Sequence, residues 1–214
     1  MLSIQQYRKR YHDTEVLSIA QLELPQGIYW IKGENGSGKS TLFKSIAGLI
    51  PFEGEIRCQG QSVKSDPVQY RRRIQYAEAE PLFPGFLTGK DLVRFIGKTR
   101  NADVNEQDEC CSQFGINSFF EQPCETFSSG MMKKLSLALA FLGNPDVIIL
   151  DEPLITLDVQ ARQILIDEIV KRAAKGTMFL LSSHQLLESA DFPLAGSFHI
   201  REKQLFSDDH IPRT

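Results

Sequence analysis

The chain has 214 residues, enough for one large α/β domain or one domain with a sub-lobe, and either can bury a sizeable core. Its formal net charge is −3, with 24 Lys and Arg residues interspersed among 27 Asp and Glu residues, which argues against a nucleic-acid partner. The four cysteines lack metal or disulfide spacing, and the sequence contains no signal peptide or apolar stretch long enough to span a membrane. We therefore expect a cytosolic chain with reduced thiols.

A phosphate-binding loop is expected early in the chain, between a strand and a helix. The apolar run Ile28–Ile31 precedes the sequence GENGSGKST at residues 33–41. Leu42, Ile46 and Leu49 then repeat at helical spacing. Glycines let the backbone curl so that N–H groups point inward at a helix N-terminus, which attracts phosphate. The loop residues expected to hold a nucleotide are Gly33, Asn35, Gly36, Ser37, Gly38, Lys39, Ser40 and Thr41.

Three side chains of this loop have separate expected roles. Lys39 would reach the β- and γ-phosphates, the Ser40 hydroxyl would ligate Mg²⁺, and Thr41 would donate toward the α-phosphate. A glycine-rich turn without function is the alternative interpretation. The strand before the loop and the helix after it favour the phosphate site.

Helical patterns replace strand patterns between about residues 86 and 141. Thr88–Asp91 matches a capping box, and a second helical stretch runs from Asn105 to Gly115. A third helix is expected to begin at Ser128 and to end before the sequence Gly-Asn-Pro at 143–145. We interpret this segment as a separate helical lobe.

Two buried strands follow, with a helix between them. Val147–Leu150 and Met178–Leu181 are continuous apolar runs, which is typical of parallel strands covered by helices on both faces. Asp158 is a candidate N-cap for the intervening helix, and Gly176 ends it. This β-α-β order around a phosphate loop predicts a mainly parallel sheet with helices on both sides.

Polar residues follow both buried strands, at the edge where nucleotide-binding sheets place their ligands. Asp151 would hold Mg²⁺, and Glu152 would orient and polarise the water that attacks the γ-phosphate. A lone Asp-Glu pair is more often two solvated acids, but the phosphate loop favours the functional interpretation. His184 follows the second strand and could contact the γ-phosphate. The expected catalytic residues are thus Glu152, His184 and Lys39.

From about Tyr11 to Phe206 the chain resembles the nucleotide-binding cassette of ABC transporters. The diagnostic segment is Phe127–Met131, which resembles the ABC signature sequence and stands at the expected spacing from the two strand-end motifs. The resemblance implies a P-loop NTPase fold, a single ABC ATPase domain over residues 1–214. Its α/β core would comprise residues 1–85 and 142–214, with a mainly parallel sheet flanked by helices and an antiparallel β edge. Residues 86–141 would form an inserted helical subdomain.

The resemblance also implies a head-to-tail dimer with two ATP molecules between the subunits. Ser128 and Gly130 of one subunit would meet the γ-phosphate bound by the other, and Asp158 would touch the opposite subunit. Tyr11 matches the aromatic residue that stacks on adenine. Plain packing of Tyr11 and an N-cap role for Asp158 are the alternatives.

Three positions in two segments depart from the family pattern. Ala79 stands where the family usually carries a Gln that senses Mg²⁺, with Glu78 and Glu80 on either side. A carboxylate would bind the metal more strongly than an amide but would repel the γ-phosphate, so hydrolysis or its coupling could be altered. Ser129 and Met131 stand where Gly and Gln are more usual, a variation that resembles exporter-type cassettes.

The function expected from the resemblance is Mg²⁺-dependent ATP binding and hydrolysis that powers an ABC transporter, possibly an exporter. The chain would work as a homodimer bound to separate integral membrane permease subunits, on the inner face of the cell membrane. A soluble ABC-type ATPase with a regulatory or assembly role is the alternative, and a nucleotide-binding adaptor with little hydrolysis is a third. The sequence leaves the substrate, the direction of transport and the membrane partner open.

Overall fold

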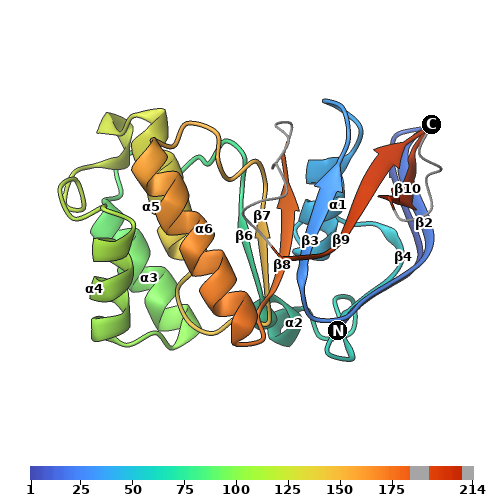
Figure 1. Cartoon of the computed structure of the whole chain (residues 1–214), viewed down its shortest axis with the longest axis horizontal. Helices are drawn as coiled ribbons and strands as arrows, with labels where there is room; N and C mark the ends of the chain where they lie inside the picture. The colour runs from blue at the N-terminus through green and yellow to red at the C-terminus, as the bar shows by residue number, and fades with distance from the viewer. Residues whose placement is uncertain (184–192, 209–214) are drawn as a thin grey trace.

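The computed structural model describes residues 1–183 and 193–208, in which ten strands form one mixed sheet with helices packed on it (Figure 1). In sheet order the strands are β5 (Gln61–Ser62), β4 (Glu53–Cys58), β1 (Leu2–Tyr11), β2 (Thr14–Leu24), β10 (Gln204–Ser207), β9 (Leu194–Arg201), β3 (Ile28–Lys32), β8 (Met178–Ser182), β7 (Val147–Leu150) and β6 (Ile74–Ala77).

The neighbouring strands β9, β3, β8, β7 and β6 run parallel to one another. Every residue of β7 and β8 is buried, as the continuous apolar runs predicted. Because parallel strands end at the same edge of a sheet, β3, β6, β7 and β8 deliver their following loops to one place. That edge carries the candidate site.

The antiparallel part of the sheet is wider than the sequence indicated. β1 and β2 are 10 and 11 residues long and pair with each other, while β4 and β5 continue the sheet beyond β1. Of β1 and β2, the sequence pattern indicates only Leu22–Leu24 as a strand, because the polar residues along both strands hide their extended pattern. The expected fold class is nevertheless confirmed.

Helices cover both faces of the sheet. They are α1 (Lys39–Ile46), α2 (Pro67–Arg73), α3 (Gly89–Arg100), α4 (Val104–Gln113), α5 (Ser129–Ala140) and α6 (Val159–Ala174), with a 3₁₀ turn at Cys124–Thr126. The capping box at Thr88 and Asp91 is present, and Ser128 and Asp158 cap α5 and α6 as predicted. Helix α2 was not expected. It begins with Asp66 as N-cap and Pro67 in its first turn.

Residues of β7 alternate between two apolar cores, one on each face of the sheet. Val147 and Ile149 pack in the core with α1 and α2, whereas Ile148 and Leu150 pack in the core with α3 to α6. The helical segment therefore shares its core with the parallel strands. All four cysteines are buried thiols, as expected, and burial raises the pKa of Cys110 to about 12. No helix among the described residues has the length and apolar composition needed to cross a bilayer.

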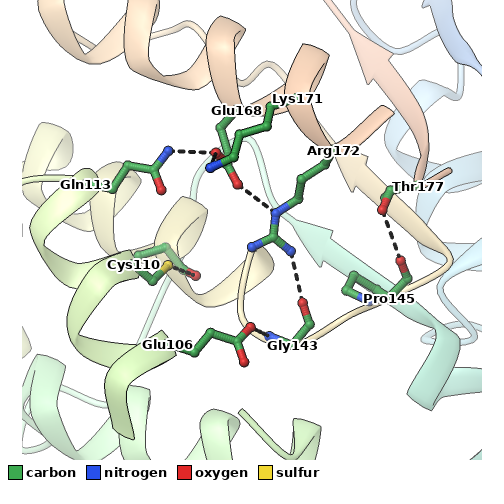
Figure 2. Close-up of polar contacts among 10 residues, drawn as sticks. Glu106, Cys110, Gln113, Gly143, Pro145, Glu168, Lys171, Arg172 and Thr177 are labelled. Atoms are coloured by element: carbon green, nitrogen blue, oxygen red, sulfur yellow. Dashed lines mark hydrogen bonds and ion pairs between the residues drawn. The ribbon is translucent and has the colours of Figure 1, made fainter. Parts of the chain in front are cut away.

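Figure 2 shows the polar contacts that join α4, α6 and the loop before β7. On α6, the buried Glu168 carboxylate accepts hydrogen bonds from Arg172 at 2.8 Å and from Gln113 of α4 at 2.8 Å. Arg172 also donates to the carbonyl of Gly143 at 2.9 Å. The N–H of Gly143 donates to Glu106 of α4 at 2.8 Å. Because Gly143 shortly precedes β7, these bonds join the two helices near the edge where the parallel strands begin, opposite the edge that carries the strand-end loops.

We predict that Glu168→Ala lowers the free energy of unfolding by about 2–4 kcal/mol, because it leaves Arg172 and Gln113 without their buried partner. Burial alone would raise the pKa of Glu168, but hydrogen bonds from Arg172 and Gln113 lower it overall. A lowered folded-state pKa stabilises the fold above the unfolded pKa, and this contribution is lost as the pH falls through the folded pKa.

Urea denaturation at neutral and acid pH measures both effects, and the difference between wild type and Glu168→Ala should shrink as Glu168 is protonated. Lys171→Ala serves as the control, because Lys171 reaches the same carboxylate from a largely exposed position and should change stability by less than about 1 kcal/mol. Equal losses in the two variants would contradict the prediction.

Candidate nucleotide-binding site

The loop after β3 ends at the N-terminus of α1 with two glycines in left-handed conformation. Gly36 has φ 78° and Gly38 has φ 109°, and a Cβ at Gly38 would lie 3.3 Å from Val16. Gly38 is also the N-cap of α1, and no side chain caps the helix. The first N–H groups of α1 therefore face the loop, where they can bind an anion.

Lys39 is held inside this loop. Its ammonium donates to the carbonyl oxygens of Gly33 at 2.7 Å and Glu34 at 3.1 Å, and the residue is only 6% exposed. Burial lowers the pKa of Lys39, and the carboxylates of Glu152 and Asp151 act in the opposite direction. The lysine thus places a cation between the loop and two acids, with a further N–H able to reach an anion.

A pocket of about 430 Å³ opens over the loop and the strand ends. Its lining combines backbone and side chains from the loop, from the segment after β6 and from the segment after β7. The lining residues are Asn35, Gly36, Gly38, Lys39, Ser40, Thr41, Ala79, Glu80, Asp151, Glu152 and Ile155. The structure therefore brings the predicted loop residues other than Gly33 and Ser37 together with the two acids that follow Leu150.

The Asp151 carboxylate is fixed by two hydroxyl groups. Ser182 of β8 donates to one carboxylate oxygen at 2.6 Å, and Tyr76 of β6 donates to the other at 3.2 Å. Burial and the charge of Asp151 raise the pKa of Tyr76, so this hydroxyl keeps its proton. Sequence reasoning missed both residues. Their signal was their position at the carboxyl ends of two strands that flank β7.

Glu152 adopts a left-handed backbone conformation with φ 46°. This conformation costs a non-glycine residue roughly 1–2 kcal/mol. The N–H of Glu152 donates to the Ser182 hydroxyl at 2.9 Å, so one buried serine holds both acids. Backbone strain of this kind gathers at functional sites, where neighbouring contacts enforce it.

The pocket offers the groups that bind a nucleoside triphosphate and a divalent cation. An uncapped helix N-terminus and Lys39 offer positive charge, and the buried hydroxyl oxygen of Ser37 has no hydrogen-bond partner among the described residues. Ser40 and Asp151 both line the pocket and offer oxygen ligands. Within residues 1–183 and 193–208, no group of three or more Asp, Glu, His or Cys side chains is placed to hold a metal ion. A hard cation would therefore complete its shell with phosphate and water, as Mg²⁺ commonly does.

The two acids of the segment after β6, Glu78 and Glu80, have different surroundings. Ala79 and Glu80 line the pocket, whereas Glu78 forms an ion pair with Lys44 of α1 at 3.6 Å. Of the two acids beside Ala79, only Glu80 is thus part of the pocket lining.

Ser128, Gly130 and Asp158 do not line the pocket of their own chain. Ser128 caps α5 by accepting from the N–H of Met131, and a Cβ at Gly130 would lie 3.2 Å from the carbonyl of Thr156. Asp158 caps α6 and forms an ion pair with Lys134 at 2.8 Å. These residues share a second surface, formed by the start of α5 and the loop before α6.

A further predicted residue, Tyr11, is not part of the pocket lining. Tyr11 ends β1, is 49% exposed and stacks under the Lys9 ammonium, which lies 4.4 Å from the ring centre. His184 lies outside the described residues.

Comparison with known proteins gives a consistent family. Residues 17–155 match the protein family described as ABC transporter. The chain is 32% identical to the cytochrome c biogenesis ATP-binding export protein CcmA of Legionella pneumophila, over 91% of this chain and 95% of the relative. It is 33% identical to the daunorubicin/doxorubicin resistance ATP-binding protein DrrA of Streptomyces peucetius, over 86% of this chain and 57% of the relative.

Solved structures of similar proteins have the same fold. An ATP-binding subunit of an ABC transporter superposes with a TM-score of 0.88 at 25% identity, covering 97% of this chain and 90% of that one. An ATP-binding cassette solved as a dimer with ADP and Pi superposes with a TM-score of 0.85 at 18% identity, covering 96% of both chains. The second likeness concerns the fold alone.

Proposed function

The chain belongs to the ABC transporter family, and from that premise we propose specific roles for its residues in ATP hydrolysis and its coupling to transport. It is an ATP-binding subunit that hydrolyses ATP to power transport. The observation that carries the assignment of roles is the pocket in which an uncapped helix N-terminus and Lys39 face Asp151 and Glu152. The cation can bind a phosphate group, and the acids in the same pocket can hold a metal ion and activate a water molecule.

The glycine-rich loop holds the triphosphate in this proposal. N–H groups of Gly36, Gly38 and Lys39 point to the phosphates, the Lys39 ammonium contacts the β- and γ-phosphates, and Thr41 donates to the α-phosphate. The loop residues Gly33, Asn35 and Ser37 shape and complete this cradle. Mg²⁺, when bound by Ser40 and Asp151, supplies charge that stabilises the transferring phosphoryl group.

Glu152 orients and polarises the attacking water, because its carboxylate follows a fixed strand end and its backbone is locked by Ser182. Lys39 stabilises the negative charge that builds on the phosphate oxygens. His184 is proposed as a γ-phosphate contact on the ground of its position in the sequence, two residues after β8.

Two copies of the chain form a head-to-tail dimer in this proposal. Ser128 and Gly130 of one subunit complete the ATP site of the other, with Asp158 at the same interface. The shared surface of α5 and the loop before α6 supports this role, because it presents all three residues together. Tyr11, exposed at the end of β1, is available to stack on adenine.

Permease subunits of the membrane are the proposed partners, which would hold the chain on the inner face of the cell membrane. A groove of about 280 Å³ is lined by residues of β6, of α2 and α3, and of the segments that follow α1 and β6. Leu82 in its lining and Phe86, later in the same segment, are 89% and 80% exposed, so an apolar partner surface could cover them. The proposed helical subdomain, residues 86–141, takes part in this contact. It is inserted between the core segments 1–85 and 142–214.

Export is the proposed direction of transport, because the printed names of the relatives describe an export protein and a drug-resistance protein. The alternative, a soluble ATPase with a regulatory or assembly role, is not favoured by these relatives. Copurification of the chain with an integral membrane protein separates the two.

We predict that Glu152→Gln binds ATP normally but hydrolyses it at least about 100-fold more slowly, since the water loses its base. The variant should accumulate as an ATP-bound dimer on size-exclusion chromatography. Adding Ser128→Arg should abolish that dimer while the monomer still binds ATP, because Ser128 serves the opposite site.

Hydrolysis by Glu152→Gln at the wild-type rate would show that Glu152 does not orient the attacking water. Wild-type specific activity that does not rise with protein concentration would count against the site completed in trans.

We predict that Ala79→Gln raises the turnover number about twofold or more, because a neutral oxygen at the pocket assists metal and water without repelling the γ-phosphate. Steady-state ATPase assays measure the change. Glu78→Ala is the control and should have little effect, since Glu78 points to Lys44. If Ala79→Gln changes nothing while Glu80→Ala cripples turnover, a carboxylate has taken over the role of the missing amide.

A further inference from the structure

Lys133, on α5, is a charged residue that none of the roles above uses. It is 1% exposed, and it lies on the helix whose N-cap is Ser128. Its ammonium donates to three backbone carbonyl oxygens: Glu78 at 2.9 Å, Ala79 at 3.1 Å and Asp151 at 3.0 Å. One side chain therefore joins α5, the segment after β6 and the residue that follows β7.

The burial of this ammonium is costly, and the site itself compensates for it. An isolated cation loses several kcal/mol when it leaves water. All three N–H donors of Lys133 have an acceptor, and the charges of Asp151 and Glu152 lie near enough to favour the cation. Burial nevertheless dominates and lowers the pKa of Lys133 to about 8. A buried charge held at such a cost indicates a role beyond filling space.

The bonds of Lys133 hold the segment after β6 by its backbone alone. Ala79 offers only a methyl group, so its side chain cannot fasten the segment to the site. Lys44 of α1 holds Glu78 from one side through its carboxylate, and Lys133 of α5 holds Glu78 and Ala79 from the other through their carbonyls. The third bond reaches the carbonyl of Asp151, directly before Glu152.

We propose that Lys133 is a positioning residue for ATP hydrolysis, which fixes the Glu78–Ala79 backbone and the Asp151–Glu152 turn to helix α5. The proposal rests on the proposed roles of Asp151 and Glu152. Since Ser128 caps α5, a shift of that helix end against the opposite subunit moves Lys133 and, through it, the two acids. The ammonium thus links the surface that completes the partner's site to the catalytic carboxylates of its own chain.

Lys133→Met tests this role, because methionine keeps most of the unbranched side chain and removes its three donors. We expect the turnover number to fall about 10- to 100-fold, the range typical for groups that orient metal ligands, while the KM for ATP changes less than about twofold. Lys133→Arg, which restores the charge and donors, should recover turnover to within about fivefold of wild type. Lys175→Met, the same change at an exposed position, should match the wild type.

A Lys133→Met variant that hydrolyses ATP within twofold of the wild-type rate overturns the proposal, and so does one that loses ATP affinity as much as turnover. The latter would mean that Lys133 only supports the fold. If Lys133→Met does not fold, Lys133→Gln takes its place, with two neutral donors, and the same split between turnover and KM decides. Wild-type turnover tests the proposed function separately, since the inference concerns only the ratio of variant to wild type.

Discussion

The buried carboxylate of Asp151 is the group on which the arrangement of the site depends. At 2% exposure it requires hydrogen-bond partners inside the protein, and the fold supplies them from two neighbouring strands: Ser182 on β8 and Tyr76 on β6. Lys39 and Lys133 bring positive charge from two helices. The parallel strands end at one edge for topological reasons, and this requirement for charge compensation explains why polar groups gather there.

Helix α5 connects two surfaces that the proposed dimer requires. Its N-terminus presents Ser128 and Gly130 beside the loop that precedes α6, and its second turn carries Lys133 to the acids of the same chain. At the far end of the helical segment, Glu168 and Arg172 join α6 to α4 and to Gly143. The segment is thus fastened at both ends, and its apolar core is continuous with the sheet.

Signals carried by a few adjacent residues were predictable from the sequence. The phosphate loop, the buried strand Val147–Leu150 and the capping box at Thr88 all depend on local backbone chemistry, and they are present. Ser182, Tyr76 and Lys133 could not be identified in this way, because their partners lie 18 to 75 residues away in the sequence. The long antiparallel strands β1 and β2 were not predicted for a related reason. Their pairing specifies them more than their polar sequence does.

The central claim is that the pocket over the β3–α1 loop binds ATP through its phosphates, and titration calorimetry of ATP with wild type and Lys39→Met tests it most directly. Loss of a charge-assisted contact should weaken ATP binding about 10- to 100-fold. Lys98→Met, on the exposed surface of α3, should leave the affinity unchanged. Wild-type ATP affinity in Lys39→Met would contradict the account.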